Sequence, residues 1–388
     1  MQQAPANKQT RIFFPNLDGL RFLCFFAVFL HHCYLTLFSY TRESWPGFFS
    51  AQSFLFEYGT LGVNFFFVLS GFLITFLLLK EREITGTIHI GNFYVRRILR
   101  IWPLYFLCLF IGFVLFPLMK NMGGEAIHES ANPWYYIFLA GNFDYMNTWP
   151  ERPDAILLSV LWSVCVEEQF YLTWPIILKF TPLRYYKYIF LAIILFSLGF
   201  RAFYTGGTEA DHAVRYFHTF SLIGDMALGG LLAYYVSFPN KFQTFVSNLG
   251  WPGVLAIYAG AIGFSLFKEH IFSYGIPVIF ERLVIGFFFG MIILEQNYAR
   301  GSIFKLGRSR LLSRLGIYTY GMYCLHLLGM YAAVLVVLKM GWPQNSIWVA
   351  IGSALLALIL SILISLASFH FFEKWFLKLK NRFAFITR

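Results

Sequence analysis

The sequence has few charged residues. Asp, Glu, Lys and Arg make up 13% of its 388 residues, whereas soluble domains carry roughly 25%. A soluble globular protein is therefore excluded. The chain also lacks a Gly-rich phosphate loop, a run of metal ligands and a nucleophile elbow. The usual signatures of P-loop enzymes, metalloenzymes and serine hydrolases are thus missing, and we expect no metal cofactor.

Cysteines are also scarce. The five present are far apart, and all fall inside apolar stretches: Cys24, Cys33, Cys108, Cys165 and Cys324. A disulfide framework or zinc site needs clustered or regularly spaced cysteines. We therefore expect these residues to act as small apolar packing groups.

Apolar side chains are abundant, at 58% of the chain, with 21% aromatic. About ten stretches are long enough to cross a ~30 Å hydrocarbon core as helices. They lie near residues 20–38, 55–79, 98–118, 156–178, 187–204, 214–236, 251–267, 276–295, 315–338 and 346–371. This predicts an all-α, polytopic bundle forming a single membrane domain over residues 1–388. We expect a polar N-terminal tail at 1–16, an uncleaved first span and a basic tail at 372–388.

The net charge of +11 follows the predicted topology. With ten spans and the N-terminus inside, 21 Lys and Arg residues lie in cytoplasmic segments and seven in outer ones. The seven outer cations are Arg42, Lys120, Arg152, Arg201, Arg215, Lys268 and Lys339. This positive-inside bias predicts cytoplasmic termini and a multi-pass protein of the cell (inner) membrane. It also explains the basicity, so we expect membrane lipids and no nucleic acid as partners.

The first span, LDGLRFLCFFAVFLHHC at residues 17–33, carries Arg21 near its start and His31 and His32 near its end. Arg21 and His32 are 11 residues apart, or three helical turns, so they share a face about 16 Å apart along the axis. His31 points about a quarter turn away. A cation and an imidazole on one face indicate a polar track inside the bundle rather than a lipid-facing anchor.

Arg96, Arg97 and Arg100 precede the third span and are followed by Trp102 and Tyr105. Each arginine can act as a snorkelling anchor at the inner interface. Together they also suit a phosphorylated ligand arriving from the cytoplasm, because guanidinium groups bind phosphate oxygens bidentately. The residues alone leave both readings open.

Glu167 and Glu168 are adjacent in the middle of the fourth span. A charge there costs several kcal/mol unless it is paired or solvated. The two side chains point about 100° apart, so at most one needs to face the same cavity as Trp162 or Ser163. We expect one of them to pair with a buried arginine or to shape the polar track.

Other polar residues also lie in apolar surroundings. Ser70 in the second span is expected to face the bundle interior, and His326 in the ninth falls near mid-depth. The longest outer segment, residues 119–155, holds Asn142, Tyr145 and Trp149; its aromatic rings can stack on a sugar or form an interfacial belt. We place Ser70, Trp162, Ser163, His326 and Asn142 in substrate binding. Asp225, Glu281 and Arg282, together with Arg215 and His218, are candidate partners for one another or for Arg21.

Five segments together resemble the family-3 membrane acyltransferases, which O-acylate bacterial polysaccharides, lipopolysaccharide, peptidoglycan and some small molecules. These segments are LDGLRFLCFFAVFLHH, VNFFFVLSGFLIT, FYVRRILRIWPLYFL, LWSVCVEEQFYLTWP and YGMYCLHLL. The resemblance implies that His32 is the catalytic histidine, with Arg21 as its companion. It also implies an acyl-CoA site at the three arginines, to which we add Tyr105. Glu167, Glu168 and Ser163 fall on a motif of the family, and we count both glutamates as catalytic.

The resemblance implies transfer of an acyl group, with acetyl expected, from cytoplasmic acyl-CoA to a hydroxyl of an extracytoplasmic or lipid-linked glycan. His32 can act as general base on that hydroxyl or accept the acyl group itself, and we prefer the first. Some relatives carry a further soluble domain. Without one, we expect the membrane domain to finish the transfer or to hand the acyl group to a partner.

A proton-coupled secondary transporter of a small solute is the main alternative. Glu167, Glu168, Asp225 and His326 could form its proton relay. A transporter has no need of the arginine cluster or of the polar track between Arg21 and His32. Transfer of label from acetyl-CoA to a glycan, as opposed to solute uptake, discriminates the two classes.

Overall fold

The computed structural model describes residues 10–11, 14–48, 58–124, 126–383 and 386–387. Outside this set lie residues 1–9 and 12–13 of the predicted polar tail, residue 125 of the predicted outer segment, residues 384–385 and 388 of the basic tail, and the predicted start of the second span at 55–57. The described chain is almost entirely helical, which confirms the predicted all-α class. Two short strands, β1 (Thr10–Arg11) and β2 (Ile386–Thr387), pair in parallel and bring the two ends of the chain together.

The first half of the chain forms these helices: α1 (Pro15–Leu35), α2 (Ser39–Ser44), η1 (Tyr58–Thr60), α4 (Leu61–Thr85), α5 (Ile90–Phe110), η2 (Ile111–Leu115), α6 (Phe116–Met122), α7 (Pro133–Ile137), α8 (Gly141–Thr148), η3 (Ile156–Val160), α9 (Leu161–Phe180), η4 (Leu183–Tyr185) and α10 (Tyr186–Ala202). The second half forms α11 (Glu209–Phe217), α12 (Thr219–Ser237), α13 (Lys241–Ser247), α14 (Trp251–Ile271), α15 (Pro277–Tyr298), η5 (Leu306–Arg308), α16 (Arg310–Ile317), α17 (Thr319–Lys339), α18 (Ile347–Ser368), η6 (Phe369–Glu373), α19 (Lys374–Lys380) and η7 (Asn381–Phe383).

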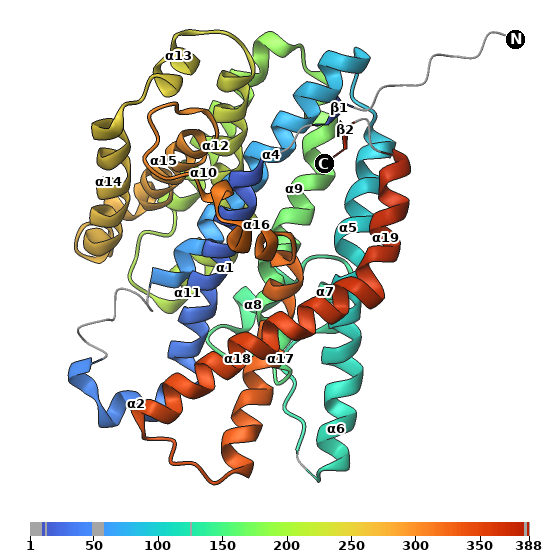
Figure 1. Cartoon of the computed structure of the whole chain (residues 1–388), viewed down its shortest axis with the longest axis vertical. Helices are drawn as coiled ribbons and strands as arrows, with labels where there is room; N and C mark the ends of the chain where they lie inside the picture. The colour runs from blue at the N-terminus through green and yellow to red at the C-terminus, as the bar shows by residue number, and fades with distance from the viewer. Residues whose placement is uncertain (1–9, 12–13, 49–57, 125, 384–385, 388) are drawn as a thin grey trace, which may run out of the picture.

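Nine helices in the described part of the chain are long and apolar enough to cross a membrane. They correspond to the second to tenth predicted spans. The predicted first span is α1, a 21-residue helix that is not among the nine. The α18 helix crosses the front of the molecule and continues through η6 into α19 (Figure 1).

Helix α4 lies at the centre and packs against α12, α1, α15 and α9. Two glycines allow the closest approach: a Cβ added at Gly71 would lie 1.9 Å from the carbonyl oxygen of Met226, and one at Gly229 would lie 2.0 Å from that of Val68. Close packing through small residues replaces the hydrophobic effect as the main force between helices in lipid. Gly71 and Gly229 therefore act as close-packing positions between α4 and α12.

Gly59 and Gly62 hold α1 against η1 and α4 in the same way. A Cβ added at Gly59 would lie 2.2 Å from the carbonyl oxygen of Ala27. A Cβ added at Gly62 would lie 2.5 Å from the carbonyl oxygen of Cys24. The position of α1, and thus of His32, depends on these two contacts.

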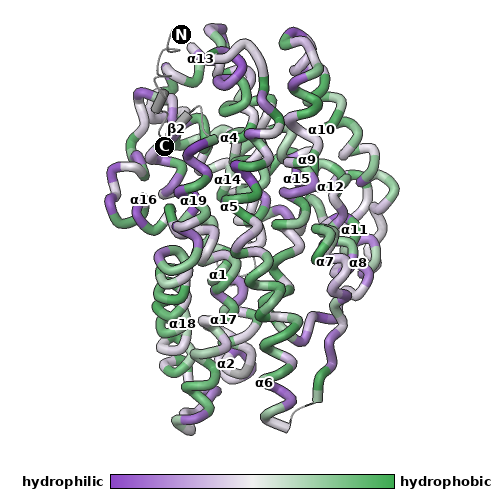
Figure 2. Tube along the Cα trace, turned by 90° about the vertical axis from the view of Figure 1, so that its right-hand side faces the viewer, coloured by the Kyte–Doolittle hydropathy of each residue, from purple (hydrophilic) through white to green (hydrophobic). Residues whose placement is uncertain are grey.

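Helix α18 has a small inner face and a large apolar outer face. Ala357, Ser361 and Ser365 are fully buried against α17, whereas Leu355 and Ile359 are more than half exposed. Hydrophobic residues predominate along the long helices, including α10 and α18 (Figure 2). This pattern fits helices that contact lipid outside and one another inside.

Candidate functional site

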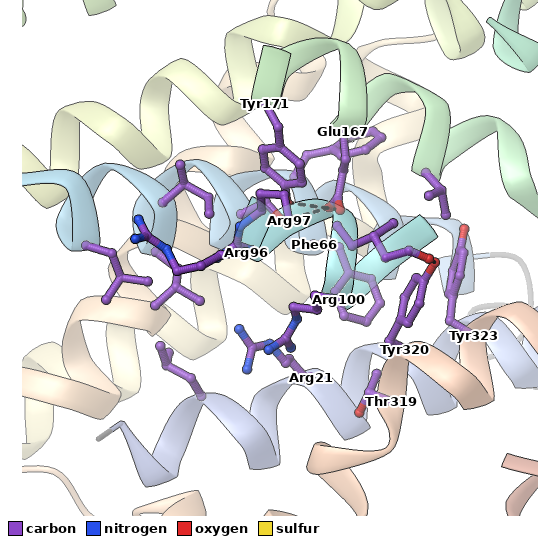
Figure 3. Close-up of a pocket in the computed structure, with 18 of the residues that line it drawn as sticks. Arg21, Phe66, Arg96, Arg97, Arg100, Glu167, Tyr171, Thr319, Tyr320 and Tyr323 are labelled. Atoms are coloured by element: carbon purple, nitrogen blue, oxygen red, sulfur yellow. Dashed lines mark hydrogen bonds between the residues drawn. The ribbon is translucent and has the colours of Figure 1, made fainter. Parts of the chain in front are cut away.

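Two cavities lie within the bundle. We call the first the arginine cavity, because Arg21, Arg96, Arg97 and Arg100 all line it. Lys380 is a fifth cation in its wall, and Glu81 and Glu167 are its acidic residues. The side chains of Arg21 on α1 and Arg100 on α5 point toward one another (Figure 3). The structure therefore gathers the predicted arginines around one space, as an anionic ligand requires.

Two of these arginines have different surroundings. Arg96 donates to Oε2 of Glu81 at 2.7 Å and to the carbonyl oxygen of Phe383 at 2.8 Å. The Arg97 guanidinium lies 5.6 Å from the ring centres of both Phe93 and Tyr171, and its buried Nε has no hydrogen-bond partner among the described residues. Arg97 thus has more unused donor capacity than Arg96.

The adjacent glutamates separate as their helical spacing predicts. Glu167 lines the arginine cavity and accepts hydrogen bonds from Ser70 (2.7 Å) and Tyr171 (3.1 Å). Glu168 is 4% exposed, lines neither cavity and accepts from the indole N–H of Trp102 at 2.7 Å. Among the described residues, neither forms an ion pair with an arginine. Glu167, beside Arg97 and Tyr171 in Figure 3, is the one placed to act on a ligand.

The second space, which we call the histidine cavity, has a volume of about 490 Å³, within the usual range of ligand pockets. His31 and His32 line it from α1, and Trp162 lines it from α9. Tyr145 and Trp149 of the predicted outer segment also face it. Aromatic rings beside an imidazole give this cavity surfaces on which a sugar ring can stack.

His32 is held by a second histidine. Its Nδ1 lies 2.8 Å from Nε2 of His326, and Nδ1 of His326 lies 2.8 Å from the carbonyl oxygen of Tyr323. A carbonyl only accepts, so Nδ1 of His326 carries a proton. When both rings are neutral, Nε2 of His326 must then accept from Nδ1–H of His32. The remaining lone pair of His32 is on Nε2, which is the form that a general base needs.

The two cavities share residues at one place. Val63 and Tyr323 line both, and the Tyr323 hydroxyl lies 2.6 Å from Oγ of Ser163, which lines the arginine cavity. Tyr323 on α17 therefore stands in the wall that the two cavities share, with Ser163 on α9 beside it on the arginine side.

The structure distributes the predicted site residues as follows. Seven line the arginine cavity: Arg21, Ser70, Arg96, Arg97, Arg100, Ser163 and Glu167. His32 and Trp162 line the histidine cavity, with His326 behind His32. Ser70 and Ser163, predicted to bind the substrate, thus lie on the arginine side.

Tyr105 and Asn142 line neither cavity. The buried Tyr105 hydroxyl donates to the carbonyl oxygen of Tyr136 at 2.7 Å. Asn142 is also buried, donates to the carbonyl oxygen of Phe217 and accepts from Gln169. Both side chains therefore link separate segments of the fold through hydrogen bonds. Their positions do not support the ligand contacts predicted for them.

Several cavity residues were missed by sequence reasoning, including Tyr323 and the cations Arg152, Arg201, Arg215 and Lys268. Tyr323 could have been suspected from its helical spacing to His326. Arg152, Arg201 and Lys268 were counted only for topology and Arg215 was otherwise considered only as an ion-pair partner, although positive charge on the outer side runs against the usual bias. These outer cations were therefore the feature of the sequence that could have indicated the cavity.

Residues 14–366 match the acyltransferase domain family. The chain belongs to this family. Two relatives extend the comparison with other acyltransferases. The peptidoglycan O-acetyltransferase OatA of Listeria monocytogenes is 26% identical over 390 residues, which cover 94% of this chain and 56% of the relative. The O-acetyltransferase OatA of Staphylococcus aureus is 32% identical over 238 residues, covering 57% of this chain and 34% of the relative.

This acyltransferase chain therefore spans about a third to about half of the length of the curated relatives it matches. No solved structure matches it. The matched residues cover most of the described bundle, including the histidine cavity and all of the arginine cavity except Lys380 and Asn381.

Proposed function

We propose that the chain is a membrane O-acyltransferase that uses acyl-CoA as donor, a glycan hydroxyl as acceptor and His32 as general base. The observation that carries this proposal is the wall shared at Val63 and Tyr323. It places a cavity lined by arginines next to a cavity lined by His32. A donor with phosphates and an acceptor with a hydroxyl need two such neighbouring cavities, with the base in one of them.

The arginine cavity is the proposed donor site. Five cations and two glutamates line it, and the phosphates of CoA match this excess of positive charge. Phe14 and Leu17 of the first described segments and Lys380 near the other end of the chain also line it. If both ends are cytoplasmic, as the positive-inside bias predicts, this cavity opens to the compartment where acyl-CoA is made.

The proposed reaction takes place where the cavities meet. The acceptor hydroxyl gives its proton to Nε2 of His32, and its oxygen forms a bond to the thioester carbonyl carbon. The C–S bond then breaks, and the CoA thiolate takes the proton back from the imidazolium. The hydrogen bond from Nδ1–H to His326 keeps the lone pair on Nε2 and orients the ring.

A nucleophilic mechanism would use the same lone pair, with the acyl group carried on Nε2. Incubation with radiolabelled acetyl-CoA in the absence of acceptor separates the two mechanisms. Label that remains covalently bound to the denatured protein favours the acyl-histidine. Its absence, with transfer intact, favours the general base.

The experiment that tests the function supplies radiolabelled acetyl-CoA to inverted membrane vesicles containing the chain. We expect label on a lipid-linked or polymeric glycan, with none in vesicles carrying His32→Ala. Proton-coupled uptake of a solute without transfer of label would support the transporter alternative instead. Family membership already favours the enzyme.

A further inference from the structure

The histidine cavity gathers cations where the membrane topology disfavours them. Of the seven Lys and Arg residues predicted in outer segments, four line this one cavity: Arg152, Arg201, Arg215 and Lys268. Arg282, from within α15, is a fifth. Because cations are sparse on that side, their convergence on one cavity calls for an explanation beyond orientation of the chain.

Among the described residues, acidic side chains do not balance these charges. Glu281 is the one acid in the described lining of the cavity. Its carboxylate lies 3.8 Å from the Arg201 guanidinium and 3.7 Å from the Lys268 ammonium, both longer than a hydrogen bond. Asp225, behind the wall, forms a close ion pair with Arg282. In the part of the chain that the structure describes, these five cations and two carboxylates leave an excess of three positive charges.

The arginines are firmly held in place. Arg201 is 2% exposed and donates to the carbonyl oxygens of Val278 and Ile279. Arg215 donates to those of Tyr204 and Gly206. These carbonyls fix the side chains but carry no full negative charge to neutralise them. The positive field in the cavity is therefore part of the fold.

One of the cavity cations is open to a ligand, whereas Arg282 is not. Nε of Arg282 has no hydrogen-bond partner among the described residues but is fully buried, and its guanidinium is paired with Asp225. The side chain of Arg152 is exposed and forms no ion pair with the part of the chain that the structure describes. Both lie in the wall that also contains His32 and Trp149.

We propose that the histidine cavity selects an acceptor that carries an oxyanion, a phosphate or a carboxylate, close to the sugar whose hydroxyl is acylated. The cations hold the oxyanion, and Tyr145 and Trp149 line the same space as surfaces for the sugar ring. The charge thereby positions the hydroxyl near His32. This inference rests on the proposed function and specifies the chemical class of its acceptor.

The test compares three acceptors that differ only at one end. They are an N-acetylglucosamine tetrasaccharide, the same chain with a terminal 1-phosphate, and the same chain oxidised to a terminal carboxylate. With purified full-length protein and radiolabelled acetyl-CoA, we expect kcat/KM to be at least about tenfold higher for a charged acceptor than for the neutral one. The charged acceptor with the higher kcat/KM shows whether the cavity selects a phosphate or a carboxylate.

Equal kcat/KM for the three acceptors would overturn the inference while leaving the proposed function standing. If label reached none of them and no envelope glycan either, the proposed function would fail. The two failures are thus separate results of one assay.

Variants test whether the cavity cations cause the preference. Arg152→Gln and Lys268→Gln should each raise the KM for the charged acceptor about tenfold relative to the KM for the neutral acceptor, with the KM for acetyl-CoA unchanged. Lys268→Arg keeps the positive charge, so this variant should retain the preference for the charged acceptor. The matched control is Lys339→Gln, since Lys339 is an exposed outer cation at the end of α17 that does not line the cavity. If Lys339→Gln gave the same change, general surface charge would be responsible and the inference would be wrong.

Discussion

Nδ1 of His32 lies 2.8 Å from Nε2 of His326, although the two residues are 294 positions apart in the chain. One comes from α1 and the other from α17, and their rings are stacked at 5.0 Å between centres. His326 in turn is held by its bond to the Tyr323 carbonyl. The pair thus gives a buried imidazole a defined orientation and a defined proton position.

The two neighbouring histidines of α1 should differ in importance. His32→Ala removes the proposed base, so we expect transfer to fall by at least about 10²-fold, with membrane insertion and thermal stability retained. His31→Ala should reduce transfer much less, because the contact to His326 belongs to His32. Both are measured as acetyl transfer by purified protein. Equal loss in the two variants would show that the assignment of the base is wrong.

His326 is expected to be a positioning residue. His326→Leu removes the acceptor for Nδ1–H of His32 and should lower kcat by about 10–100-fold, with little change in either KM. His326→Gln supplies a side-chain oxygen that can accept and should recover part of that loss. If leucine and glutamine were equally active, the orienting hydrogen bond would have no role in the reaction.

The arginine cavity predicts a donor-specific defect. Arg96→Gln and Arg97→Gln should raise the KM for acyl-CoA, and Arg97→Gln more so, by about tenfold, because Arg96 already engages Glu81. The KM for the acceptor should change little. Lys80→Gln is the control, since Lys80 pairs with the exposed Glu83 outside the cavity. A larger effect on the acceptor KM would move the cluster out of the donor site.

Gly59 should tolerate no side chain. In Gly59→Ala, the new methyl would lie 2.2 Å from the Ala27 carbonyl oxygen and 2.6 Å from Cβ of His31, so α1 must shift. We expect a loss of about 1–3 kcal/mol of stability together with reduced transfer. Thermal unfolding in detergent measures the first. Gly91→Ala, where the added methyl meets open space, should leave the melting temperature unchanged or slightly raised.

The buried pair of Asp225 and Arg282 gives a prediction for stability. Asp225→Asn leaves the Arg282 charge without its closest partner and should destabilise the protein by about 3–5 kcal/mol. The double variant Asp225→Leu with Arg282→Met removes both charges and should melt at a higher temperature than the single variant. If the double variant melted lower than the single one, the pair would not behave as a coupled unit.

Much of this architecture could be predicted from the sequence alone. Apolar stretches of sufficient length predicted the membrane helices, because a backbone in lipid must satisfy its own hydrogen bonds. The helical period also predicted that only one of Glu167 and Glu168 needs to face a cavity, and the structure assigns that place to Glu167. These are local properties, set by a period of 3.6 residues and by side-chain polarity.

Contacts between distant segments were decided only by the tertiary structure. Nothing in the spacing of residues pairs His32 with His326, places Tyr323 between two cavities, or draws Arg152 and Lys268 to one wall. Tyr105 and Asn142 were predicted to contact ligands from the segments they lie in. In the structure both side chains instead donate hydrogen bonds to backbone carbonyl oxygens and line neither cavity. Helix packing fixes these relationships through glycine contacts such as Gly59 on Ala27, and the order of residues along one helix does not contain the position of its neighbours.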